Sequence, residues 1–155
     1  MIRGSVMFKR VLLCYDGSVA GGRALKRGAE LAILLGAHVH VLSIIPNSVA
    51  NAAVIAGATG NACFVDDSSG YRKLLDRSLE WLKAHGLEAE GYLVTGNTLD
   101  QIAAHAKRLA IDLIVLGHYP QPSGGLWWWG GPQRASLAER VGCCVFVAVS
   151  AEDEP

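Results

Sequence analysis

The sequence predicts one α/β domain, an open, doubly wound parallel sheet with helices on both faces. Two observations indicate this class: near-continuous apolar runs alternate with segments of helical period, and five predicted strands alternate with four predicted helices. Continuous apolar runs are typical of strands that are buried on both faces, as in parallel sheets. The chain has 155 residues, the usual size of one domain, so we assign residues 1–155 to a single unit.

The chain begins with a predicted strand, helix and strand. The first strand is expected over 8–15 and is broken by Asp16, Gly17 and Ser18. Ser18 is a suitable N-cap for a helix that Gly36 then ends. A second strand is expected over 38–45, which gives a βαβ unit with a right-handed crossover.

A long connection is predicted over 47–70. This stretch is rich in small residues, has no sustained period and carries no charge before Asp66. Loops of this length are uncommon in compact domains and often serve as flexible lids or interfaces. A surface excursion without a role is the equal alternative.

The second half of the chain is predicted to complete the sheet. A helix that starts near Tyr71 stops at Gly86, and a less apolar strand over 88–95 belongs nearer a sheet edge. Thr98 and Gln101 are expected to form a capping box for the next helix. The remaining elements are a strand over 112–116, a helix over 134–141 and a strand over 143–149.

The predicted loops suggest where a ligand would bind. In parallel sheets, ligands collect beyond the carboxyl ends of the strands, at the point where the strand order reverses. If the first and fourth predicted strands are neighbours, the break at Asp16 and the loop that begins at Gly117 face each other across a crevice.

Composition excludes several classes of function. The formal net charge is zero and no basic stripe is present, so no nucleic-acid partner is expected. No window reaches the roughly 18 apolar residues of a membrane span, and the apolar start is too short for a signal peptide. We therefore expect a cytoplasmic protein without a membrane partner. The histidines lack metal-ligand spacing, so no metal site is expected. Four cysteines are interpreted as buried, reduced thiols: Cys14, Cys63, Cys143 and Cys144.

Several motifs together resemble the universal stress protein family. They are VLLCYDGS, VLSII, VTGNTLDQIAAHAKRLAIDLIVLG and the closing glycine loop, helix and VFVAV strand. The resemblance covers nearly the whole chain apart from about 47–70. It implies strand order 3-2-1-4-5 and a non-enzymatic stress-response or regulatory homodimer. The dimer would pair through the last strand, at Val145, Phe146 and Val147.

Some members of that family bind ATP at the crevice, through an aspartate, second-strand backbone and a G-x-x-G-x9-G-[ST] loop. Asp16 matches the aspartate, Ile44 the backbone position and Gly117 the first glycine. The expected contact set is Tyr15, Asp16, Gly17, Ser18, Ile44, Gly117, His118, Tyr119, Gly130 and Gly131.

The phosphate loop of this chain departs from the family pattern. Pro120, which has no amide hydrogen, holds the second glycine position. The third glycine is Gly130 or Gly131, and the residue after it is then Gly131 or Pro132, so either alignment loses the hydroxyl. We therefore expect weak or altered binding of an adenine nucleotide, either AMP or ATP with Mg²⁺. A nucleoside or monophosphate is less affected, because Asp16 and Ile44 remain.

The loop after Gly117 carries further candidates. Trp127, Trp128 and Trp129 are expected to form a lid or an interface, or to fold back on the sheet edge. His118 and Tyr119 are ligand-contact candidates, and no catalytic residue is assigned. Two alternative functions remain: a nucleotide-dependent switch or slow ATP hydrolase, and a partner-binding adaptor that uses the tryptophans.

Overall fold

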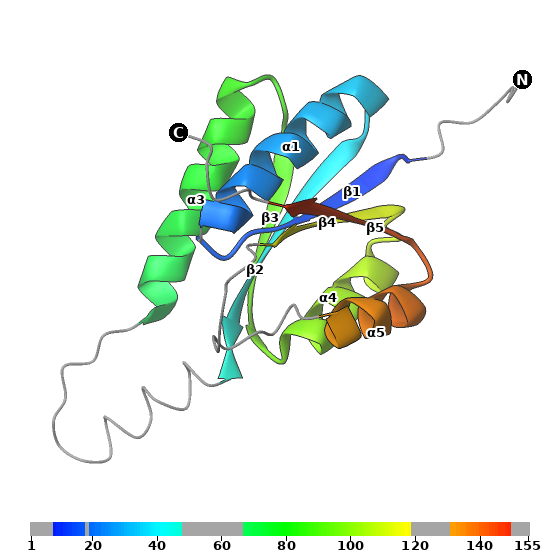
Figure 1. The fold of residues 1–155 in the computed structure, drawn as a ribbon. Helices are drawn as coiled ribbons and strands as arrows, with labels where there is room; N and C mark the ends of the chain where they lie inside the picture. The colour runs from blue at the N-terminus through cyan, green and yellow to red at the C-terminus, as the bar shows by residue number, and fades with distance from the viewer. Residues whose placement is uncertain (1–7, 18, 48–66, 119–130, 150–155) are drawn as a thin grey trace, which may run out of the picture.

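The structure is a computed structural model, and it describes residues 8–17, 19–47, 67–118 and 131–149. Strands and helices alternate along this part of the chain (Figure 1). In chain order they are β1 (Arg10–Cys14), α1 (Val19–Leu35), β2 (His38–Pro46), α3 (Asp67–Ala84), β3 (Ala89–Gly96), α4 (Thr98–Arg108), β4 (Leu113–His118), α5 (Gly131–Val141) and β5 (Cys144–Val149).

The five strands form one parallel sheet in the order β3-β2-β1-β4-β5. This order confirms the predicted fold class and the strand order that the resemblance implies. It also confirms that β3 lies at an edge. The chain builds outward from β1 to β3 and then returns to add β4 on the other side of β1. The strand order therefore reverses between β1 and β4, where a crevice is expected.

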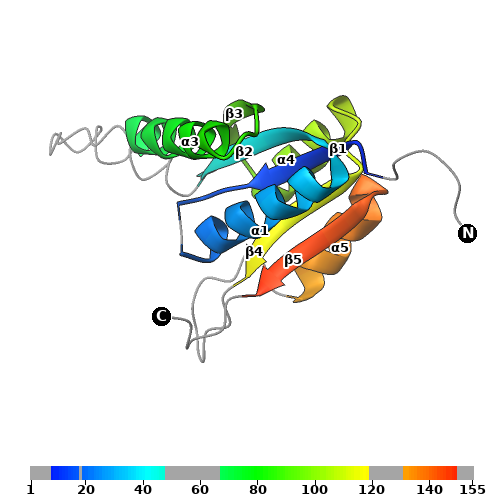
Figure 2. The ribbon, with the colours of Figure 1, turned by 90° about the horizontal axis from the view of Figure 1, so that it is seen from above.

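Helices cover both faces of the sheet. α1 and α3 pack on one face, around a cluster that includes Leu13 and Val115, and α1 lies along β1 and β4 (Figure 2). α1 comes close to these strands at Gly28, where an added Cβ would collide with Leu13 and lie 3.3 Å from Val115. A side chain at this position would push α1 away from the sheet.

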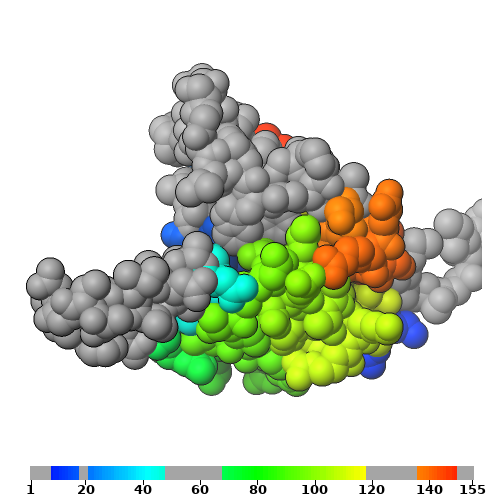
Figure 3. All heavy atoms as spheres, turned by 90° about the horizontal axis from the view of Figure 1, so that it is seen from below, coloured from blue at the N-terminus to red at the C-terminus, as the bar shows by residue number. Residues whose placement is uncertain are grey.

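The second face is covered by α4 and α5, which lie side by side (Figure 3). Their core cluster includes Leu12, Ile114 and Leu137, all fully buried. On the surface, Arg140 Nη2 donates to Asp100 Oδ1 over 2.6 Å and joins the two helices.

The neighbours β1 and β4 are also joined by a side chain. The main-chain amides of Lys9 and Arg10 donate to Asp112 Oδ2 over 2.7 and 2.9 Å. The amide of Asp112 in turn donates to the carbonyl oxygen of Arg10 over 3.0 Å. These bonds fix the start of β1 against the start of β4.

Some sequence expectations need correction. The first four residues of α3, Asp67–Gly70, belong to the helix and not to the preceding connection, whose residues 48–66 lie outside the described part. α5 starts at Gly131 rather than at residue 134. Cys144 is exposed, because it lies on the edge strand β5, and Cys14 and Cys143 are half-buried.

The predicted capping box of α4 is also wrong. Asn97 is the N-cap, because its backbone is extended (φ −71°, ψ 128°) and its Oδ1 accepts from the amide of Asp100 over 3.2 Å. Thr98 is already the first helical residue. Its side chain is therefore not needed to cap α4.

Candidate functional site

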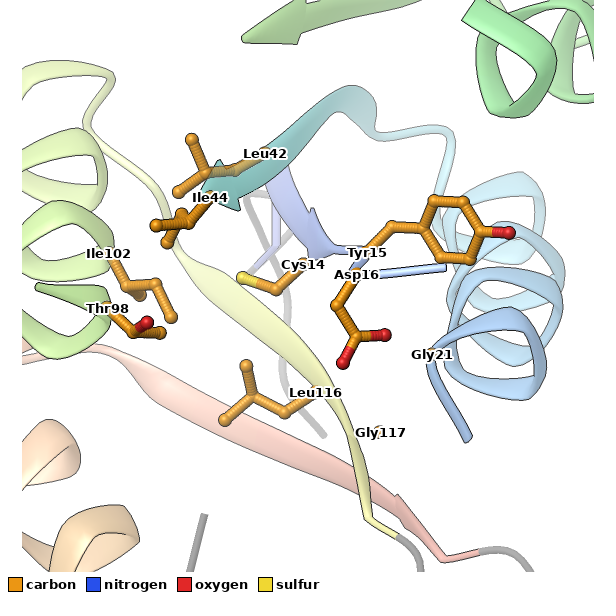
Figure 4. Close-up of a pocket in the computed structure, with 10 residues that line it drawn as sticks. All are labelled: Cys14, Tyr15, Asp16, Gly21, Leu42, Ile44, Thr98, Ile102, Leu116 and Gly117. Atoms are coloured by element: carbon orange, nitrogen blue, oxygen red, sulfur yellow. The ribbon is translucent and has the colours of Figure 1, made fainter. Parts of the chain in front are cut away.

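A pocket lies at the carboxyl ends of β1, β2 and β4, where the strand order reverses (Figure 4). Its lining residues are Cys14, Tyr15, Asp16, Gly21, Leu42, Ile44, Thr98, Ile102, Leu116 and Gly117. The cavity volume is about 30 Å³, within an open cleft of about 390 Å³. A space of this size holds one or two water molecules, so the walls lie close together.

The floor of the pocket forms because β2 runs further than β1. The last register pair between them is Cys14 with Leu42, and the amide of Tyr15 then donates to the carbonyl oxygen of Leu42 over 3.0 Å. The carbonyl oxygen of Tyr15 is bonded by Ser43 Oγ over 2.8 Å, which holds the end of β1 against β2.

Ile44 continues the series of β2 residues whose main chain faces β1. The amide of His38 and the carbonyl of Leu42 both bond to the β1 segment, so the main-chain groups of even-numbered residues point that way. Ile44 lies beyond the last β1 pair and lines the pocket. Its amide and carbonyl are therefore a donor and an acceptor directed to the pocket.

The side walls of the pocket are apolar. Leu42 and Ile44 come from β2, Ile102 from α4 and Leu116 from β4, and each is at most 6% exposed. Cys14 contributes a thiol whose pKa is raised by burial and, to a smaller extent, by the negative charge of Asp16. This thiol is thus protonated at neutral pH and is a weak nucleophile.

Asp16 and Gly17 form the turn from β1 toward α1. Gly17 has a φ of +82°, and an added Cβ would lie 2.5 Å from Leu74 Cδ1. Asp16 is exposed, and in Figure 4 its carboxylate lies on the same side of the pocket as Gly117. The turn therefore presents the carboxylate at the mouth of the crevice.

The structure brings together part of the predicted site. Asp16, Ile44 and Gly117 all line the pocket, although they come from three different strand ends. The ring of Tyr15 extends away from the pocket and packs against the cluster under α1 and α3, so only its main chain contributes (Figure 4). Gly17 shapes the turn without lining the pocket.

The other predicted contacts are placed only in part. His118 is the last residue of β4 and Gly131 is the first residue of α5. Several residues lie outside the described part: Ser18, Tyr119, Pro120, Trp127, Trp128, Trp129 and Gly130.

Sequence reasoning missed several lining residues, including Leu42, Thr98, Ile102 and Leu116. A signal for them was present. Leu42 shares a strand face with Ile44 by the period of two, and Thr98 shares a helix face with Ile102 by the spacing of four. Because Thr is a good N-cap residue, capping alone accounts for Thr98 in the sequence, and no second role is needed to explain it there.

A larger groove, of about 680 Å³, lies at the opposite end of the sheet, the amino edge, where the strands begin. It is lined by Arg10, His38, Val39, His40, Leu79, Glu80, Lys83, Glu88, Ala89 and Glu90. Two of these residues contact Tyr92, which is not itself part of the lining. Tyr92 Oη donates to Glu90 Oε2 over 2.8 Å and lies 3.3 Å from His40 Nδ1. Burial lowers the pKa of His40, and the nearby Glu90 opposes this effect.

The described residues also lack a metal cluster and a membrane-spanning helix. They contain no group of three or more His, Cys, Asp or Glu side chains arranged to hold a metal ion. None of their helices is both long enough and apolar enough to cross a bilayer.

The predicted dimer strand, β5, is the outermost strand of the sheet on the side opposite β3. β5 pairs with β4 on one side only. Phe146 is 43% exposed and Val149 is 65% exposed, whereas Val145 packs against the cluster under α4 and α5. The strand therefore presents apolar side chains beside an open edge.

Comparisons with known proteins agree with this geometry. The family model of the universal stress protein family matches residues 7–130. No curated protein matches the chain. Among solved structures, universal stress protein UspA from Lactobacillus plantarum is similar with a TM-score of 0.70 and 18% identity, over 90% of this chain and 97% of that chain.

Two other similar structures contain nucleotides. A universal stress protein in complex with cAMP has a TM-score of 0.63 and 18% identity, over 93% of this chain and 98% of that chain. The universal stress protein from Archaeoglobus fulgidus in complex with dAMP has a TM-score of 0.59 and 18% identity, over 92% and 98%. Identities this low show the shared fold alone. The match of the family model, which covers most of the chain, together with the strand order, shows that this chain belongs to the universal stress protein family.

Proposed function

We propose that this protein is a non-enzymatic stress-response or regulatory module that binds adenine nucleotides weakly, with a preference for monophosphates. The observation that carries the proposal is the pocket at the strand-order reversal, where Asp16, Ile44 and Gly117 meet. The complexes of two similar proteins with cAMP and dAMP support the choice of an adenine monophosphate.

The chemistry of the pocket suits a nucleoside. Apolar walls from Leu42 and Leu116 favour the faces of a base, and the main-chain groups of Ile44, which lie beyond the last register pair with β1, match the donors and acceptors of its edge. The carboxylate of Asp16 at the mouth accepts hydrogen bonds from ribose hydroxyls. A base and a sugar thus find complementary groups in the described residues.

The phosphate side is weaker. α5 begins at Gly131, and because α5 connects β4 to β5, its N-terminus lies at the carboxyl edge, where it attracts negative charge. Pro120 and the lost hydroxyl remove two donors that the family pattern supplies. Hydrogen bonds to charged groups contribute about 1.5–3 kcal/mol each, so a triphosphate loses more than a monophosphate.

The small size of the cavity also supports weak binding. The enclosed part of the cleft, about 30 Å³, is smaller than an aromatic base, so a base that enters this part fully must push its walls apart. Moving the buried side chains Ile102 and Leu116 apart costs packing energy that the ligand has to offset.

Calorimetric titration with AMP, cAMP, and ATP with and without Mg²⁺ tests this function. We expect AMP to bind at least as tightly as ATP, and Asp16→Ala to weaken every ligand about tenfold or more. Asp76→Ala, which removes an exposed carboxylate from α3, is the matched control. Tight ATP binding with a large ATP-dependent rise in melting temperature would contradict the proposed preference.

We also propose that the protein is a homodimer that pairs through β5. Exposed apolar side chains next to an unpaired strand edge favour addition of a second sheet. Light scattering should give the mass of a dimer, and Phe146→Glu should give that of a monomer. Leu34→Glu, at a position 83% exposed on α1, should leave the mass unchanged. A wild-type monomer at high protein concentration would refute the pairing.

A further inference from the structure

Thr98 lines the pocket with a hydroxyl to which no other described residue is hydrogen-bonded. It is the first residue of α4, and the cap of this helix is provided by Asn97. Within the described ranges, the Thr98 hydroxyl forms no hydrogen bond with another group of the chain, whereas the hydroxyl of Ser43 is bonded to the carbonyl of Tyr15. Both its donor and its acceptor are therefore free for a ligand.

The surroundings of Thr98 make this free hydroxyl consequential. Its neighbours in the pocket are Ile44, Ile102 and Leu116, with exposed fractions of 6%, 0% and 2%. A ligand that covers this hydroxyl without offering it a hydrogen bond leaves a polar group unpaired in an apolar setting, which is costly.

The position of Thr98 indicates which part of a ligand it meets. Thr98 and Ile102 lie at the end of the pocket away from Asp16 (Figure 4). If the ribose lies at Asp16, as in the proposed function on which this inference rests, the six-membered ring of a purine reaches toward Ile44 and Thr98.

We propose that Thr98 is a specificity-determining residue that reads the exocyclic group on the six-membered ring of the purine. A hydroxyl both donates and accepts hydrogen bonds, so it pairs with a 6-amino group or with a 6-oxo group. A purine without this substituent leaves the hydroxyl unpaired. The ligand class is therefore the 6-substituted purine nucleosides and their monophosphates.

Calorimetric titration with AMP, IMP and purine riboside 5′-monophosphate tests this role. In the wild type, AMP and IMP should bind within about threefold of each other, and purine riboside 5′-monophosphate about three- to tenfold more weakly. Thr98→Val keeps the shape and removes the hydroxyl, so the weaker binding of purine riboside 5′-monophosphate relative to AMP and IMP should shrink to the part that the main chain of Ile44 supplies. Thr95→Val, at an exposed position of β3 outside the pocket, should behave as the wild type.

Two outcomes would overturn the inference, and they differ. If Thr98→Val retains the wild-type discrimination between the three ligands, Thr98 does not read the base, and the proposed function is unaffected. If none of the three ligands binds the wild type at millimolar concentration, the proposed function fails and the role of Thr98 fails with it. Circular dichroism of each variant confirms that the fold is retained.

Discussion

The two ends of the sheet, the amino edge where its strands begin and the carboxyl edge where they end, differ in what their polar groups do. At the amino edge, a groove of about 680 Å³ is lined by charged residues, and Tyr92, Glu90 and His40 lie within bonding distance of one another. At the carboxyl edge, a cavity of only about 30 Å³ has apolar walls, and the described residues form no hydrogen bond with the Thr98 hydroxyl that lines it. By volume alone, the groove at the amino edge would be the better candidate for a ligand-binding site. The free hydrogen-bonding groups and the strand-order reversal select the carboxyl edge instead.

The largest expected contrast concerns stability. Ile102→Ala removes a fully buried side chain that also walls the carboxyl-edge pocket, and should lower the free energy of unfolding by about 2–5 kcal/mol. Leu79→Ala, at a half-buried position of the amino-edge groove, should cost less than half as much. Urea denaturation measures both. Equal costs would mean that the two edges are equally well packed.

The next contrast concerns nucleotide affinity. Asp16→Asn keeps the size of the side chain but removes its charge, and should weaken AMP binding by about tenfold, because charge-assisted hydrogen bonds are the stronger kind. Glu88→Gln makes the same change at the amino edge and should have no effect. Titration calorimetry of both variants decides between the edges. A loss of affinity in Glu88→Gln alone would move the site to the amino-edge groove.

A smaller effect is expected at the helix cap beside the pocket. Asn97→Ala removes the bond to the amide of Asp100 and should destabilise the protein by about 1 kcal/mol. Thr98→Val should cost less, because its hydroxyl caps nothing. Thermal unfolding of the two variants gives the comparison. A larger loss for Thr98→Val would restore Thr98 as a cap and remove the basis for its role in binding.

The smallest effect is a pH dependence at the amino edge. Burial lowers the pKa of His40 below 6.5; Glu90 raises it, and Arg10 and His38 lower it. At pH values between the pKa of His40 in the folded state and its pKa in the unfolded state, the unfolded chain binds more protons. The free energy of unfolding therefore falls as the pH drops through about 6.5. His40→Gln should flatten this part of the profile, as measured by urea denaturation at several pH values. An unchanged slope would exclude His40 as its source.

Most of the fold followed from the sequence, because apolar period and turn residues mark each element. The strands over 38–45 and 143–149 were expected within one residue of their observed ends. The sequence alone leaves the cap of α4 ambiguous, because Asn97 and Thr98 are both good cap residues and only the backbone conformation distinguishes them. The strand order came from the family resemblance, since five parallel strands can be ordered in several ways.

The candidate site was predicted less completely than the fold. Asp16 and Gly117 were identifiable because they directly follow or end apolar runs. Thr98 and Ile102 contribute from a helix that is adjacent to the pocket only in three dimensions. The amino-edge contacts of Tyr92 also depend on register, which places His40 opposite Glu90 on the neighbouring strand. Periodicity alone does not determine this register.

The hydrogen bonds of Asp112 have a consequence for folding kinetics. They join residues about a hundred positions apart, Lys9 and Asp112, so the β1–β4 pair closes a very long loop. Contacts of such sequence separation are slow to form. The crevice exists only once this closure is complete. A ligand held between Asp16 and Gly117 therefore binds the fully folded chain alone and stabilises it against global unfolding.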